Sequence, residues 1–207
     1  MKLPQSPDRP LPLSPSDVKE INVPLWRIFK TSGAHPSTWN EMREFGPLPS
    51  MRFDPHPAGV PQDHPGVGVA YAGEDFYTAF AEVFSDAHTI DRNEDIRVLA
   101  AWEPTRTLSV LDLTAREVPS FFGAASIQMT DDKVTTQTWA RALFEDHGLN
   151  VDGIRSRSSV DNGIVITLFS RAADSFPAAP REYQELRSSG ADYYVDRASV
   201  QLKFGVI

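Results

Sequence analysis

The sequence contains no cysteine, so disulfide bonds and thiolate metal sites are both excluded. A chain without cysteine is suited to a reducing compartment. The sequence also lacks an apolar run of about 18 residues, and prolines interrupt its N-terminal region, where a signal peptide would need an apolar segment. We therefore expect a cytoplasmic protein that does not engage a membrane.

Positive charge is scarce as well. The chain has 20 Lys and Arg residues against 28 Asp and Glu residues, which gives a formal net charge of -8. A general nucleic-acid binder neutralises phosphates with clustered Lys and Arg, so direct contact with nucleic acid is not expected. An anionic ligand would have to be held by a local basic pocket.

The histidines do not suggest a metal site. His35, His56 and His64 lie in a segment rich in proline and glycine, and none is paired with another histidine at i, i+4. Loop histidines flanked by proline are usually part of the polar surface. We therefore expect no metal.

The 207 residues suffice for one domain with its own core. Residues 1–23 carry five prolines, which predicts an extended N-terminal arm over residues 1–24, with a helical turn at 17–20, outside the catalytic core. Residues 25–207 are expected to form a single domain. Mixed strands with two clear helices predict an α+β fold with a central antiparallel or mixed sheet and flanking helices.

Hydrophobic periodicity places the elements of that domain. Strands are expected at 25–29, 67–71, 96–102, 107–113, 151–154, 163–169 and 199–206. Helices are expected at 76–84, 133–147 and 181–188, and a polar loop at 155–162.

The most informative stretch is 67–84, because its hydrophobic period changes from 2 to 3.6 in the middle. A strand that includes Tyr71 is followed by a glycine turn, an acidic N-cap at Glu74 or Asp75, and a helix with one apolar stripe. Glu82 lies about 130° from the centre of that stripe, so its carboxylate can reach into a cleft without entering the core. Taken alone, Glu82 would be a solvated helix carboxylate and Tyr71 an aromatic on a half-buried strand.

Four segments together resemble the RES domain family, bacterial toxins named for an arginine, a glutamate and a serine. The segments are Trp26-Arg27-Ile28-Phe29, Met51-Arg52-Phe53, the unit at 67–84, and Asp152-Gly153-Ile154-Arg155-Ser156-Arg157-Ser158-Ser159. Each is short, and their order and spacing carry the resemblance. The family implies an ADP-ribosyltransferase-like core and activity on NAD as a substrate.

The resemblance also implies roles for particular side chains. The implied catalytic residues are Glu82, Arg52, Tyr71 and Ser158, and the implied NAD contacts are Arg27, Arg52, Tyr71, Ser158 and Ser159. Ser159 would replace Ser158 if the register slips by one. Two simpler interpretations stay open, Arg27 as a surface residue at a strand edge and Ser158 as the cap of its own loop.

Two features depart from the family pattern. Ser156 stands where a Gly-Ile-x-Tyr-x-Ser segment has its tyrosine, so part of the pocket wall must differ. Arg52 and Tyr71 are 19 residues apart, which is longer than the family leads us to expect. We interpret 55–65 as an insertion, and it bears on the reach of Arg52.

The implied chemistry is cleavage of NAD between ribose and nicotinamide. The leaving group is already cationic, so no general acid is needed, and Glu82 would stabilise the positive charge that spreads over the ribose. Tyr71 would stack on the nicotinamide ring, and Arg52 with Arg27 would bind the diphosphate. Ser158 would hydrogen-bond the ribose or Glu82.

An NAD-degrading toxin, either a glycohydrolase or a phosphorylase, is therefore the expected function. The residues do not specify the acceptor, so a protein ADP-ribosyltransferase is an alternative. Two further alternatives are a non-catalytic RES scaffold that binds a nucleotide or a partner, and a structural protein of unrelated fold. The resemblance further implies a helix-turn-helix antitoxin that covers the NAD cleft. The sequence does not decide whether the protein forms a homo-oligomer.

Overall fold

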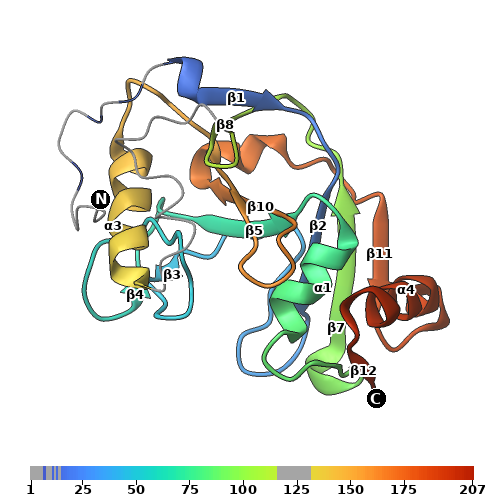
Figure 1. Ribbon diagram of the computed structural model, residues 1–207. Coiled ribbons are helices and arrows are strands. Elements are labelled where there is room, and N and C mark those ends of the chain that lie inside the picture. Colours follow the sequence, from blue (N-terminus) through green and yellow to red (C-terminus); the bar gives the residue numbers. More distant parts are fainter. Residues whose placement is uncertain (1–6, 8–10, 12, 14, 116–131) are drawn as a thin grey trace.

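An eight-stranded sheet forms the centre of the computed structural model, which describes residues 7, 11, 13, 15–115 and 132–207 (Figure 1). The strand order across the sheet is β1-β8-β9-β10-β5-β2-β7-β11. Neighbouring strands in this sheet are antiparallel, except that β8 and β9 run parallel. This mixed, mostly antiparallel sheet with helices around it confirms the expected α+β class.

The strands of the large sheet are short, and the strands at its centre lie close to the positions that the sequence predicts. In sheet order they are β1 (Val18–Ile21), β8 (Leu108–Asp112), β9 (Gly153–Arg157), β10 (Ile164–Phe169), β5 (Val69–Gly73), β2 (Leu25–Lys30), β7 (Arg97–Trp102) and β11 (Glu182–Glu185). Two small ribbons pair β3 (Phe45–Gly46) with β4 (Gln62–Asp63) and β6 (Thr89–Ile90) with β12 (Gly205–Val206).

In the part of the chain that the structure describes, three α-helices flank the sheet: α1 (Phe76–Phe84), α3 (Lys133–Glu145) and α4 (Asp192–Leu202). Asp75 caps α1 by accepting a hydrogen bond from the Thr78 backbone N–H at 2.9 Å, as the sequence predicted. Short 3-10 helices lie at Pro15–Asp17, Glu94–Ile96, Ser170–Ser175 and Ser189–Ala191. None of the helices in the described ranges has the length and apolar character that crossing a bilayer requires.

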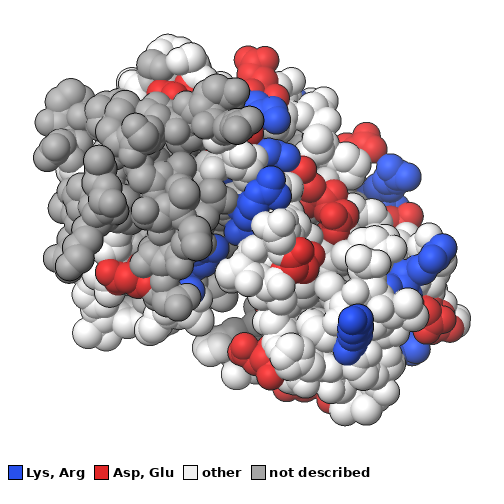
Figure 2. All heavy atoms as spheres, viewed as in Figure 1, with Lys and Arg blue, Asp and Glu red and all other residues white. Residues whose placement is uncertain are grey.

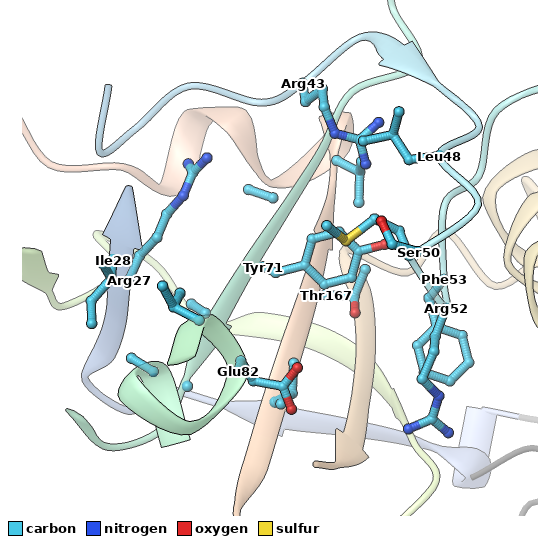
Figure 3. A pocket seen from close by; sticks show the side chains of 18 of the residues that line it. Arg27, Ile28, Arg43, Leu48, Ser50, Arg52, Phe53, Tyr71, Glu82 and Thr167 are labelled. Carbon is cyan, nitrogen blue, oxygen red and sulfur yellow. The ribbon is translucent and has the colours of Figure 1, made fainter. Parts of the chain in front are cut away.

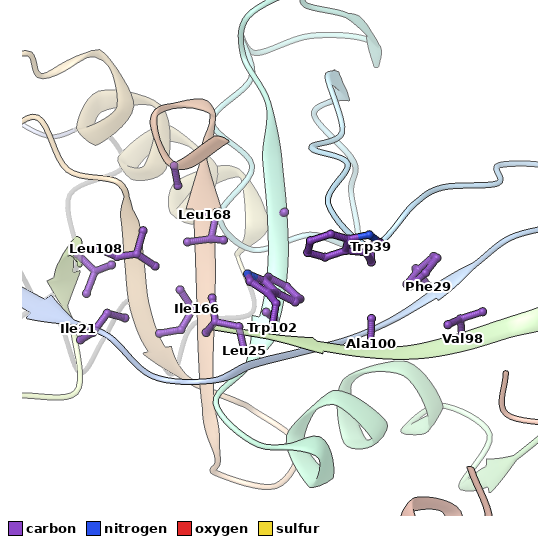
Figure 4. Close-up of a cluster of buried hydrophobic side chains, with 14 residues drawn as sticks. Ile21, Leu25, Phe29, Trp39, Val98, Ala100, Trp102, Leu108, Ile166 and Leu168 are labelled. Carbon is purple, nitrogen blue, oxygen red and sulfur yellow. The ribbon is translucent and has the colours of Figure 1, made fainter. Parts of the chain in front are cut away.

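Among the described residues, buried apolar side chains form three clusters. Trp139 of α3 is 5% exposed and packs with residues of β8 and β9. A second cluster joins α1 to α4 over β2 and β7. The third surrounds Trp102, whose ring centroid lies 5.7 Å from that of Trp39 (Figure 4). The sheet and α1 therefore pack together around the residues of the 67–84 unit.

The C-terminal prediction was largely wrong. Residues 199–206 alternate in hydrophobicity, yet only Gly205–Val206 form a strand, while α4 continues to Leu202. Val195, Ala198 and Leu202 recur at helical spacing and pack in the cluster with α1. Lys203 then ends the helix in the left-handed region, at φ 58°. Packing of α4 against α1 therefore outweighs the alternating hydrophobicity of residues 199–206.

Three other predictions need correction. The helix expected at 181–188 is the edge strand β11, paired with β7. The loop expected at 155–162 begins later, because β9 continues through Arg157. Residues 18–21 belong to the sheet and not to an arm outside the core, since they form β1 and pair with β8. Residues 1–6, 8–10, 12 and 14 of the expected arm lie outside the described residues.

Candidate functional site

A cavity of about 1090 Å³ opens beside α1 and the middle of the sheet (Figure 3). Among the described residues, five cationic and four acidic side chains line it: Arg27, Arg43, Arg52, Lys133 and Arg157, with Glu41, Asp63, Glu82 and Asp86. Basic and acidic side chains are interspersed over the described part of the face shown in Figure 2. Although the chain has a net charge of -8, the described lining of this cavity has one more cationic than acidic side chain, so cationic groups are available here to an anionic ligand.

The strand and helix of the 67–84 unit place Glu82 in the lining of this cavity. The Asp75 cap starts α1 so that Phe80 and Phe84 are buried, while Glu82 and Val83 line the cavity. The Glu82 side chain is exposed, as its place at the polar edge of the helix predicted. In the view of Figure 3 its carboxylate lies below the Tyr71 ring, with Arg27 on one side and Arg52 on the other.

Tyr71 lies on β5, and a buried carboxylate holds its hydroxyl. The Tyr71 hydroxyl donates a hydrogen bond of 2.7 Å to Asp54, which also accepts from Arg43 at 2.6 Å and from the Leu48 backbone N–H at 2.8 Å. Burial, together with the charge of Asp54 and the hydrogen bond to it, raises the pKa of Tyr71 well above its usual value. Tyr71 is therefore a neutral phenol whose only O–H is already donated.

Asp54 itself stays ionised. Burial alone would raise the pKa of this carboxyl, but the His56 ring, whose Nδ1 lies 3.7 Å from Asp54 Oδ2, the hydrogen bond and charge of Arg43 and the Leu48 N–H lower the pKa to about 2. Asp54 is 0% exposed. A fully buried anion of this kind requires the partners that surround it.

Hydrogen bonds from α3 hold the segment that carries Arg52. Gln137 of α3 donates hydrogen bonds to the carbonyls of Leu48 and Met51, both at 2.8 Å. The Arg52 guanidinium lies 5.2 Å from the centre of the Phe53 ring and donates to the Arg157 carbonyl at 3.4 Å. Although the neighbouring 55–65 segment was interpreted as an insertion, it leaves Arg52 in the cavity lining.

Arg27 lines the cavity and is not a surface residue at a strand edge. Its guanidinium donates to the carbonyl of Glu41 at 2.7 Å and, at 3.4 Å each, to the carbonyl of Trp39 and the hydroxyl of Ser37. Burial, opposed by the Glu41 charge and reinforced by that of Arg43, lowers the pKa of Arg27 to about 10. It remains cationic near neutral pH, and these three bonds leave part of its five-donor fork available to a ligand.

The three serines of the 156–159 region have different roles. Ser158 accepts hydrogen bonds from the backbone N–H groups of Val160 and Asp161, at 3.0 and 3.3 Å. It therefore caps its own loop, which was the simpler interpretation of this residue, and it is not among the residues that line the cavity. Ser156, at the position of the missing tyrosine, and Ser159 do line it.

Sequence reasoning missed several residues of the lining, among them Arg43, Lys133, Arg157 and Thr167. Arg157 lay inside a quoted motif but drew no attention, and Arg43 stands in a segment without periodicity. Asp54 adjoins the Met51-Arg52-Phe53 segment, and its position two residues after Arg52 was the one available signal.

Comparison with protein families decides the assignment, because the model of the RES domain matches residues 24–190. The chain belongs to the RES domain family. Among solved structures, the RES domain described here is similar to a chain of the M. tuberculosis MbcT-MbcA toxin-antitoxin complex. That match has a TM-score of 0.58 and 16% identity, and covers 88% of this chain and 92% of the other chain. At this identity the likeness shows a shared fold. A search of curated proteins gave no match.

Proposed function

We propose that this RES domain is a toxin that acts in the cytoplasm and cleaves NAD between nicotinamide and ribose. The observation that carries the proposal is that Glu82 of α1 and Arg52 of a distant loop line one cavity together with Tyr71. Pockets for drug-sized ligands have volumes of roughly 300–1,000 Å³. A cavity of about 1090 Å³ therefore has room for a dinucleotide.

The cationic side chains on either side of Glu82 suit the diphosphate. Arg52 and Arg27 present planar guanidinium groups, which bind phosphate oxygens in pairs better than lysine does. Tyr71 offers its ring face to the nicotinamide. With the diphosphate and the ring held, the ribose would lie near the Glu82 carboxylate.

Glu82 then acts on the transition state. As the bond from C1' to the nicotinamide nitrogen breaks, positive charge moves onto C1' and the ribose ring oxygen, and a nearby carboxylate stabilises that charge more than it stabilises the ground state. Nicotinamide leaves as a neutral molecule, so no proton donor is needed. Tyr71 cannot supply one easily, because its hydroxyl is donated to Asp54.

The serine role in the proposal changes with the structure. Ser156 is 2% exposed and lines the cavity, so its hydroxyl is the candidate for a hydrogen bond to the ribose. Ser158 contributes indirectly, by fixing the loop on which Ser159 lies.

Purified protein incubated with NAD should release free nicotinamide, and the second product identifies the acceptor. Free ADP-ribose indicates water, a phosphorylated ADP-ribose indicates inorganic phosphate, and ADP-ribose attached to protein indicates a transferase. Glu82→Ala should abolish the release and leave the melting temperature unchanged, because the side chain is exposed. Binding of NAD without release would instead support a non-catalytic scaffold.

We also propose an antitoxin as partner, of the helix-turn-helix kind. The similar fold comes from a structure named as a toxin-antitoxin complex, and an open cavity that consumes NAD would need an inhibitor in the same cell. Expression of the chain alone should arrest growth, and NAD precursors should relieve the arrest. Co-expression of a small DNA-binding protein encoded next to this chain should relieve it as well, whereas arrest that no neighbouring gene relieves would contradict the partner.

A further inference from the structure

Asp54 is buried at the junction of three segments that build the cavity. It follows Arg52 by two residues, it accepts from the Leu48 backbone N–H, and it accepts from Tyr71 on β5. Arg43, which lines the cavity, donates to the same carboxylate oxygen as Tyr71. One side chain therefore links the loop that carries Arg52 to the strand that carries Tyr71.

Such a carboxylate is not an obvious gain for stability. Transfer of an anion from water to the interior costs several kcal/mol, and well-packed apolar residues often replace buried ion pairs without loss. The carboxylate instead fixes the positions of the groups that donate hydrogen bonds to it. Three donors aimed at two oxygens leave a single arrangement of the Tyr71 hydroxyl, the Arg43 guanidinium and the backbone at Leu48.

We propose that Asp54 is a positioning residue of this site, which holds the Tyr71 ring in one orientation through the tyrosine hydroxyl and ties that ring to the Arg52 loop. The inference rests on the proposed function, in that the ring is the surface offered to the nicotinamide. A ring held in place before the substrate binds loses less freedom on binding, and small displacements at such a site cost about 100-fold in rate.

Asp54→Asn is the direct variant. The amide has the same shape, but it offers one acceptor oxygen where the carboxylate offers two, and its NH₂ group would face a donor, the Leu48 N–H or the Arg43 guanidinium. The network cannot be rebuilt. We expect kcat for nicotinamide release to fall between about 10- and 100-fold, with a smaller change in KM, because Arg52 and Arg27 still hold the diphosphate.

Tyr71→Phe tests whether Asp54 acts through the hydroxyl. If it does, the double variant Asp54→Asn/Tyr71→Phe should be no slower than the slower single variant, within about twofold. Asp152→Asn is the matched control. Asp152 is also a buried acceptor, bonded to Arg106 and to the Ser109 N–H, and it does not line the cavity. Its loss should lower the melting temperature and leave kcat and KM unchanged.

A measurement without NAD separates this inference from the proposed function. In protein with isotope-labelled tyrosine, the Tyr71 hydroxyl proton should exchange slowly with water and should resonate downfield, as a proton hydrogen-bonded to a carboxylate does. Both signatures should be absent in Asp54→Asn and present in Asp152→Asn. If the wild-type protein showed fast hydroxyl exchange and no downfield shift of the hydroxyl proton, the inference would be overturned, whether or not Asp54→Asn folds.

The kinetic results divide in the same way. Wild-type protein that does not cleave NAD contradicts the proposed function, and the NMR signatures still decide on Asp54. Cleavage that depends on Glu82 but is unchanged in folded Asp54→Asn overturns the Asp54 inference alone. Multiplied effects in the double variant would show that Asp54 does not act through Tyr71.

Discussion

Arg52 and Glu82 line the same cavity, although one lies in a loop anchored to α3 and the other on α1. A guanidinium and a carboxylate that share a cavity can bind the diphosphate and the ribose of a single NAD molecule. Had they been on opposite sides of the protein, no site for a dinucleotide would have existed. Their convergence is the geometric basis of the predictions below.

Arg52→Lys should weaken NAD binding about tenfold, because lysine keeps the charge but loses the planar pair of donors that matches a diphosphate. Titration calorimetry on a Glu82→Ala background, where NAD is not consumed, measures the affinity. Arg187→Lys is the control, since Arg187 is exposed, pairs with Glu185 at 2.8 Å and is absent from the lining. An unchanged affinity in Arg52→Lys would place the diphosphate elsewhere.

Gln137→Leu should loosen the Arg52 loop from a distance. The variant removes both hydrogen bonds to the partly buried carbonyls of Leu48 and Met51, and an acceptor left unpaired costs at most about 1–3 kcal/mol when it is fully buried. We expect a lower melting temperature and a KM for NAD raised several-fold. Gln201→Leu, on the exposed side of α4, should change neither. A lower melting temperature with wild-type KM would show that this anchor does not shape the site.

Asp54 should contribute to stability in a defined pH window. Its pKa in the folded protein is about 2, below the value of about 3.9 in an unfolded chain, so the folded state favours the anion. The contribution, about 2.6 kcal/mol, is present above pH 4 and is lost as pH falls towards 2. Denaturant unfolding of wild-type and Asp54→Asn protein should therefore give a gap that narrows between pH 4 and 2. A gap independent of pH would contradict the assigned pKa.

The sequence predicted best those parts whose burial pattern is local. The strand and helix around Tyr71 and Glu82 fold nearly as expected, because the change of period, the Asp75 cap and the apolar stripe act within one short segment. The strand that carries Arg27 was equally clear. The resemblance to a family then supplied what periodicity cannot, the convergence of distant segments on one cavity.

Other parts depended on tertiary contacts that no local pattern records. β11 is strand because the edge of β7 offers it backbone partners, and α4 is helix because α1 offers an apolar surface. Ser158 fitted the motif but turned inward to cap its loop. Asp54 was missed because its partners Arg43 and Tyr71 lie in other segments, and only folding brings them together.

The most direct test of the central claim is the rate of nicotinamide release by Glu82→Gln, measured together with NAD affinity. The amide has nearly the same size and can bind the ribose hydroxyls, but it carries no charge to oppose that of the transition state. We predict a rate lower by about 10² to 10³, with affinity within a few-fold of wild type, whereas Asp196→Asn on the exposed face of α4 should keep the full rate. Release at the wild-type rate by Glu82→Gln would contradict the account.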